Sequence, residues 1–384
     1  MVSAAKSIGA VLVAAGLVLA LPAAADGQCA LVAKASLPVL PGIDAVTVIP
    51  THIDDKATWM MIDTGAIRSM VQGHAADQMG FAREALDSNL NTAQSLTTTP
   101  APVVAGRSRR GGGGGVAVQP SPSPQINTDE IALLNRRQIE AFSVYGLGGK
   151  PIREQTRGHA VRLGALGFTD ASFLIIPDIL GEKSEVAGMI GMDLLRDYDI
   201  EFDMAGHFVN LFSPDHCAGN VVYWAKEYLS TPIEVNRDGQ VLLDVKLDGK
   251  TVRALLDTGS SETTLDQAVA SWRFDVTPET EGVTKVGDTR AADGSVLTSY
   301  EYQFKSLEIV GITFHDPALR LVPTRRPSAD RGFSLRERVA DDGPDIILGM
   351  SQLRRLRIYL ALREGMLYVT PATASVATPV SKAG

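Results

Sequence analysis

The chain has 384 residues, of which 45% are hydrophobic and 21% are charged, and its net charge is −8 at pH 7. This length is enough for two domains of ordinary size, each with its own core. The acidic balance argues against nucleic acid as a partner, because phosphate binding needs clustered Lys and Arg. Short β-branched segments, frequent Gly and Pro, and few long helical periods predict a mainly β protein.

Residues 1–25 have the layout of a secretory signal peptide. Lys6 precedes an apolar stretch over residues 8–21, and a proline and three small residues end it. The apolar stretch is shorter than the roughly 20 residues that span a bilayer, and no later segment is long enough. The sequence therefore predicts an exported protein, periplasmic or secreted, whose mature chain begins near Asp26 and has no stable membrane span.

Export would permit a disulfide bond, and the sequence holds two cysteines, Cys29 and Cys217. We expect these two residues to pair and to tie the amino-terminal arm to the end of the first half of the chain. A lipidated Cys29 is the alternative. The preceding residues 26–28 are polar, however, where such a site is expected to be apolar and small.

The first motif with chemical meaning is Asp63-Thr64-Gly65, which directly follows an apolar run. A carboxylate that ends a buried strand at a glycine turn loses hydration, and this favours its protonated form. One such motif is weak evidence, because Asp and Gly are ordinary turn residues. A short helix is expected after the motif, near residues 73–79.

Residues 97–125 do not suit a compact domain. They contain Pro-Ala-Pro, Arg-Ser-Arg-Arg, five consecutive glycines and Pro-Ser-Pro-Ser-Pro, a composition that cannot bury an apolar core. We expect a disordered insertion here, followed by a hairpin near residues 142–152. Tyr145 and Gly148 are candidates for a flap over a substrate cleft, and a half-exposed hairpin tyrosine is the alternative for Tyr145.

The same elements recur in the second half of the chain. Asp257-Thr258-Gly259 repeats the first motif at an offset of 194 positions and again follows an apolar run. A helix is expected near 266–272. Beyond it, Asp293-Gly294 between alternating apolar residues predicts a second flap hairpin.

A second pair of segments lies downstream of each motif. Met189-Ile190-Gly191-Met192 recurs as Ile347-Leu348-Gly349-Met350, at an offset of 158 positions. A short helix and a closing hairpin are expected after each copy, the hairpins at 199–212 and 358–369, and residues 213–224 are expected to cross between the halves. An ordered internal repeat of this kind indicates two lobes of the same design.

This ordered set of motifs resembles two retropepsin-type aspartic protease domains fused in one chain, in a pepsin-like arrangement, over about residues 45–371. The resemblance implies a mainly β, two-lobed acid-protease fold in which each lobe is a closed β-barrel with short helices. We expect the first lobe at 26–215, the second at 225–371, and a disordered tail at 372–384.

The resemblance also assigns roles to the motif residues. Asp63 and Asp257 would share one proton and activate a water molecule for attack on a peptide bond. Thr64 and Thr258 would reach across the interface to the opposite backbone and fix the separation of the two carboxylates. Close backbone approach would explain four glycines, namely Gly65, Gly191, Gly259 and Gly349.

One difference between the copies suggests an asymmetry. Ala66 follows the first glycine, whereas Ser260 follows the second, and a hydroxyl there can donate to the neighbouring carboxylate and favour its charged form. We therefore expect Asp257 to be the ionised member of the pair and Asp63 to carry the proton.

The sequence thus predicts an exported aspartic endopeptidase that acts on polypeptides as a monomer, with its two lobes paired within one chain. No cofactor and no metal are expected, because the six histidines lack the spacing of a metal site. A catalytically inactive relative that binds peptides or a partner protein is the alternative. A third possibility keeps the enzyme and pairs lobes between two chains.

Overall fold

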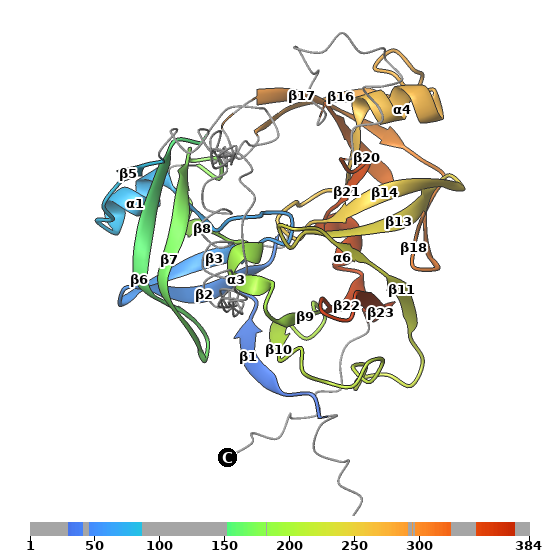
Figure 1. Ribbon diagram of the computed structural model, residues 1–384. Coiled ribbons are helices and arrows are strands. Elements are labelled where there is room, and N and C mark those ends of the chain that lie inside the picture. The colour runs from blue at the N-terminus through green and yellow to red at the C-terminus, as the bar shows by residue number, and fades with distance from the viewer. Residues whose placement is uncertain are drawn as a thin grey trace, which may run out of the picture.

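The computed structural model describes residues 30–40, 46–86, 152–181, 183–290, 294, 296–323 and 343–372. Within these ranges the protein is mainly β, with three sheets and four short helices (Figure 1). Several predicted features lie outside them: the signal peptide, Cys29, the insertion at 97–125, Tyr145, Gly148, Asp293 and the tail beyond residue 372. Across the described residues, no helix is long and apolar enough to span a membrane.

The first lobe is a seven-stranded sheet of which six strands close into a barrel. Its strands run in the order β2-β3-β8-β4-β7-β6-β5, and β6 also pairs with β2. Ile49, Ile53, Met60 and Ile62 are fully buried inside it, which follows from the apolar side chains of its first hairpin. The expected closed barrel is confirmed for this lobe. The strands are β2 (Val48–Ile53), β3 (Lys56–Ile62), β4 (Met70–Gln72), β5 (Glu84–Ala85), β6 (Glu154–Leu163), β7 (Leu166–Ile176) and β8 (Val186–Ile190).

The second lobe is a ten-stranded sheet in which the same pairings recur with interruptions. The order is β16-β17-β20-β15-β21-β14-β13-β18-β19, with β12 paired to β13. The strands are β12 (Glu234–Val235), β13 (Val241–Leu247), β14 (Lys250–Leu256), β15 (Thr264–Asp266), β16 (Thr284–Arg290), β17 (Val296–Gln303), β18 (Ser306–Ile309), β19 (Ile312–His315), β20 (Ala318–Val322) and β21 (Ile346–Leu348).

One long hairpin of the first lobe, β6–β7, corresponds to two shorter hairpins in the second. Tyr300 lies opposite Leu321 in β17–β20, and Ser306 lies opposite His315 in β18–β19, so one register continues across the break. Pro317 sits at the break, where a proline cannot donate to the ladder. Strand β18 pairs with β13, as β6 pairs with β2 in the first lobe.

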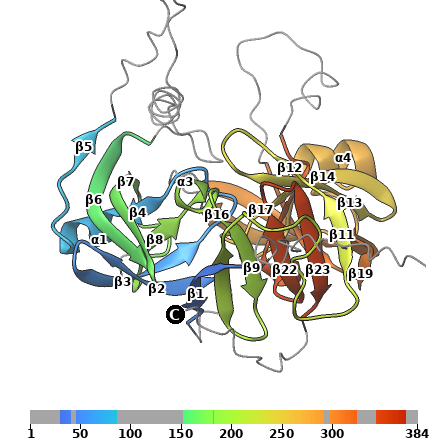
Figure 2. The same ribbon diagram turned by 60° about the horizontal axis from the view of Figure 1, so that its bottom comes forward.

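A third sheet joins the two lobes. Its order is β1-β10-β9-β22-β23-β11, so three strands from the first half of the chain continue directly into three from the second half, and the two sets meet where β9 pairs with β22 (Figure 2). The hairpins expected to close each lobe are present, but they build this shared sheet instead. The strands are β1 (Ala33–Pro38), β9 (Asp199–Asp203), β10 (Phe208–Phe212), β11 (Leu229–Pro232), β22 (Leu356–Ala361) and β23 (Met366–Pro371).

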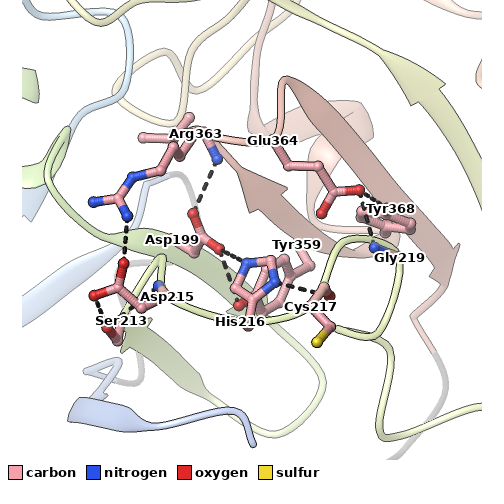
Figure 3. Close-up of polar contacts among 11 residues, drawn as sticks. Asp199, Ser213, Asp215, His216, Cys217, Gly219, Tyr359, Arg363, Glu364 and Tyr368 are labelled. Carbon is pink, nitrogen blue, oxygen red and sulfur yellow. Dashed lines mark hydrogen bonds and ion pairs between the residues drawn. The ribbon is translucent and has the colours of Figure 1, made fainter. Parts of the chain in front are cut away.

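The crossover after β10 is held against the last hairpin of the second lobe (Figure 3). His216 Nε2 lies 2.5 Å from the buried Asp199 Oδ2, and the other oxygen of Asp199 accepts from Leu362 N at 3.0 Å. Glu364 Oε1 accepts from Gly219 N at 3.1 Å. These contacts bind the crossover to both lobes.

The predicted short helices are all present. They are α1 (Gly73–Gln78), α3 (Met192–Leu195), α4 (Gln267–Phe274) and α6 (Met350–Leu353). Helix α4 begins at an N-cap, because the Asp266 carboxylate accepts from Ala268 N at 2.9 Å and from Val269 N at 3.1 Å.

Candidate active site

Each Asp-Thr-Gly loop begins where a buried strand ends beside a parallel neighbour. Strand β3 runs parallel to β8, and Asp63 N donates to Ile190 O at 3.0 Å. Strand β14 runs parallel to β21, and Asp257 N donates to Leu348 O at 3.0 Å. The two aspartates therefore leave their sheets in the same way.

The loop backbone then turns back onto each carboxylate. Asp63 Oδ1 accepts from Gly65 N and from Ala66 N, both at 2.9 Å. Asp257 Oδ1 accepts from Gly259 N at 2.9 Å and from Ser260 N at 3.1 Å. Such Asx turns fix each carboxylate with one oxygen toward its own loop.

The structure brings the two carboxyl groups together. They are hydrogen-bonded to one another, and Asp63 is only 8% exposed. Burial raises the pKa of Asp63 well above its ordinary value, and the charge of Asp257 raises it further. Burial also raises the pKa of Asp257, while its hydrogen bond with Asp63 acts in the opposite direction. The pair therefore favours a state in which Asp63 holds a shared proton.

Thr64 and Thr258 make the reciprocal contacts that the resemblance implies. Thr64 Oγ1 donates to Leu256 O at 2.8 Å, and Thr258 Oγ1 donates to Ile62 O at 2.8 Å. Each hydroxyl also accepts from the other threonine's backbone N–H, at 3.2 Å and 3.1 Å. Both side chains are buried, so these bonds lock the loops together within one chain.

All four predicted glycines are sites of close approach, but two of them face an unexpected neighbour. A Cβ at Gly191 would lie 2.7 Å from the backbone of Arg68, and one at Gly349 would lie 2.2 Å from Glu262 O. A Cβ at Gly65 would lie 2.4 Å from Asp257 Cγ, and the reciprocal distance from Gly259 to Asp63 Cγ is 2.3 Å. Glycine there makes room for the opposite carboxylate.

The expected role of the Ser260 hydroxyl is wrong. Its Oγ donates to Glu262 O at 2.8 Å, and only its backbone N–H reaches Asp257. The asymmetry of the pair therefore does not come from this side chain. The local turn gives the hydroxyl a backbone acceptor two residues further along, which a sequence comparison does not reveal.

The second-lobe flap hairpin is present as β16 paired with β17. Gly294 has a φ of 72° at its turn, and a Cβ there would lie 3.0 Å from the Pro177 side chain of the first lobe. The tip of this hairpin thus reaches the other lobe. In the first lobe, β5 and β6 pair, and the predicted flap with Tyr145 and Gly148 falls between them, outside the described ranges.

Cys217 is disulfide-bonded, while its candidate partner Cys29 lies outside the described residues.

Gln240 makes a contact that the sequence did not predict: its Nε2 donates to Gly65 O at 2.5 Å across the interface. Its counterpart in the first copy is Val46, so the repeat carried no signal for this contact. In the described part of the chain, no three His, Cys, Asp or Glu residues are placed to hold a metal ion.

Paired Asp-Thr-Gly loops at the interface of two β lobes are the arrangement of the aspartyl protease class. Residues 243–352 match the family model described as "Aspartyl protease", which confirms the predicted resemblance over that segment. No curated protein gives a significant match.

Solved structures extend the comparison. A retropepsin-like aspartic protease from Rickettsia conorii matches with 18% identity and a TM-score of 0.27, covering 39% of this chain and 96% of its own. Basic 7S globulin from soybean matches with 13% identity and a TM-score of 0.37, covering 90% of this chain and 96% of its own.

Proposed function

We propose that the protein is an aspartic endopeptidase whose catalytic residues are Asp63 and Asp257. The observation that carries this proposal is the pair of mutually hydrogen-bonded carboxyl groups at the lobe interface, of which Asp63 is buried and Asp257 is partly buried. Two carboxylates this close cannot both ionise easily, so the pair holds one proton and offers a base and an acid side by side.

The proposed reaction needs a water molecule and a peptide bond between the lobes. The ionised Asp257 takes a proton from the water as it attacks the carbonyl carbon, and the protonated Asp63 donates to the carbonyl oxygen. The roles then reverse: the proton gained by Asp257 passes to the leaving amine, and Asp63 regains its own proton. No covalent intermediate forms on the enzyme.

The flap hairpin β16–β17 also supports the proposed peptide hydrolysis. An extended peptide between the lobes would lie under a hairpin whose tip reaches Pro177, and such closure excludes water from the reaction. We further propose that both lobes are retropepsin-type barrels, because the same strand pairings surround each Asp-Thr-Gly loop.

A binding protein with the same fold is the alternative function. It would have no use for two like-charged groups buried against each other, since that arrangement disfavours ionisation of the pair and costs stability. The intact loop around each aspartate, with matching backbone donors on both sides, therefore favours catalysis.

A mixed peptide library tests the proposal directly. The mature protein should cleave internal bonds of library peptides, and a pepstatin-like transition-state mimic should stop cleavage. Retention of uncleaved peptides on the protein, with no products by mass spectrometry, would instead support the binding alternative. The mass of the active species in solution should be that of one chain.

We also propose that the protein is exported. The disulfide at Cys217 supports this, because disulfides persist in oxidising compartments. Cell fractionation followed by mass measurement should find a chain that begins near Asp26 outside the cytoplasm. A full-length cytoplasmic chain with reduced Cys217 would contradict it.

A further inference from the structure

Equivalent positions beside the two aspartates carry opposite charges. Arg68 follows Asp63 by five residues, and Glu262 follows Asp257 by five. Their backbones are placed alike, because Gly191 packs on Arg68 and Gly349 packs on Glu262. The two sides of the site therefore differ in charge where their backbones match.

Arg68 is buried without full compensation. Its side chain is 3% exposed. Its Nη2 donates to the neutral Ser172 Oγ at 3.1 Å, while its Nε lies 3.8 Å from Asp193 Oδ2. Within the described part of the chain, its Nη1 is buried and has no hydrogen-bond partner. A buried guanidinium group with an open donor is costly, and such an atom calls for a partner.

The nearest carboxylate is engaged elsewhere. Asp193 Oδ1 accepts from Ser69 N at 2.9 Å and from Ser69 Oγ at 2.7 Å. Burial raises the pKa of Asp193, which weakens its value as a counter-ion. Asp193 thus holds the loop in place and leaves the charge of Arg68 only partly balanced.

The opposite side of the site is balanced already. Glu262 forms an ion pair with Arg320, whose Nη1 also contacts Ser299 Oγ at 3.2 Å. The Glu262 side chain is 45% exposed, so water solvates it as well. Within the described residues, Arg320 Nε makes no regular hydrogen bond either, but it is ion-paired with the Glu262 carboxylate, whereas Arg68 Nη1 has no carboxylate beside it.

We infer that Arg68 binds a carboxylate of the substrate and gives the enzyme a preference for an acidic residue on the first-lobe side of the cut bond. Guanidinium and carboxylate pair with two parallel hydrogen bonds, and the open Nη1 can supply one of them. Because this atom is enclosed, the carboxylate reaches it as the cleft opens to admit the peptide. The inference rests on the proposed peptidase function and names the substrate class of that same site.

A carboxylate can come from a side chain or from the end of a peptide, so the test separates these sources. Peptides of one parent sequence carry Glu or Gln at each position in turn, each with a free and an amidated carboxyl end. The ratio of kcat/KM for Glu over Gln is measured for the wild type, Arg68→Gln and Arg68→Glu. Arg83→Gln is the matched control, since it removes an exposed positive charge from the same lobe.

The wild type should favour Glu over Gln about 10- to 100-fold at one position. Arg68→Gln should bring that ratio close to one, Arg68→Glu should lower it below one, and Arg83→Gln should keep the wild-type ratio. A preference that follows the free carboxyl end instead would assign Arg68 to the peptide terminus. A wild-type ratio of one at every position and at both ends overturns the inference, even if Arg68→Gln fails to fold.

Binding separates this inference from the proposed reaction. The same peptides are titrated into Asp63→Asn by fluorescence polarisation, with and without Arg68→Gln. Binding that prefers Glu and depends on Arg68, with no cleavage by the wild type, would uphold the inference and reject the peptidase. Cleavage without any acidic preference would do the reverse, and absence of binding by every peptide would overturn both.

Discussion

Glu201 and Tyr359 lie directly opposite each other in the central strand pair β9–β22, and they are the same position in the two copies of the repeat, 158 residues apart. A residue that pairs with its own equivalent marks the axis that relates the lobes. Near that axis the side chains are not symmetric. Arg357 of the second lobe corresponds to Asp199 of the first.

This asymmetry favours pairing of unlike lobes. Arg357 Nη2 lies 2.7 Å from Glu201 Oε1, and its Nη1 lies 2.9 Å from Asp203 Oδ2. Two first lobes joined in the same way would place acidic groups together without this arginine. The arrangement therefore disfavours the pairing of two first lobes with each other.

Loss of Arg357 should destabilise the protein strongly. Arg357→Met leaves the buried Glu201 and Asp203 without their counter-ion, and we expect a cost of about 3–5 kcal/mol in chemical denaturation. Arg363→Met is the control, because its ion pair with Asp215 is exposed and should contribute about 0–1 kcal/mol. Equal effects of the two variants would contradict the assigned role of Arg357.

The threonine pair should matter for stability and for activity. Thr258→Val removes the donor to Ile62 O and the acceptor for Thr64 N, and should cost about 1–3 kcal/mol of stability. Thr258→Ser keeps both functions of the hydroxyl and should lose much less. Denaturation curves and peptide cleavage rates of both variants check this, and indistinguishable variants would show that the hydroxyl contributes nothing.

The glycine beside each aspartate should be sensitive to a single added methyl group. In Gly259→Ala the new Cβ would meet Asp63 Cγ at 2.3 Å, so the carboxylates must move apart, and a shift of about 1 Å can lower kcat about 100-fold. Gly167→Ala is the control, since nothing lies within 4 Å of its Cβ position. A folded Gly259→Ala variant with wild-type kcat would contradict the described spacing.

The pH dependence of stability should reveal the shared proton. The raised pKa of Asp63 means that its contribution to stability is present below the pKa of the unfolded chain and is lost as pH rises through the folded pKa. At pH 7, Asp63→Asn should therefore be more stable than the wild type by about 0.5–2 kcal/mol, and the gain should shrink at pH 4.

Denaturation at both pH values measures this difference. Asp244→Asn is the control, because Asp244 is exposed, and it should change stability by less than about 0.5 kcal/mol at either pH. A destabilised Asp63→Asn protein at pH 7 would argue against a strained pair.

The sequence predicted the parts of this protein that the repeat contains. The strand that leads to Asp63, the loop threonine and glycine, and the later Gly191 segment all recur at fixed offsets, so their joint position could be inferred before any contact was known. The helices and terminal hairpins followed from the same order.

The rest depended on residues that differ between the copies. Gln240 corresponds to Val46, and Arg357 corresponds to Asp199. Neither cross-lobe contact could therefore be predicted from the repeat. The Ser260 hydroxyl donates to a backbone acceptor in its own turn, Glu262 O, and the sequence comparison did not predict this contact. The shared sheet could not be predicted because each terminal hairpin is also consistent with closing its own lobe.

The central claim is that Asp63 and Asp257 act as one catalytic pair. Cleavage of one peptide by the wild type, Asp63→Asn and Asp257→Asn, each shown to be folded, tests it most directly. Each single variant should lose at least about 1,000-fold in kcat, because either change removes the acid and base arrangement of the pair. Full hydrolysis by either variant would contradict the account.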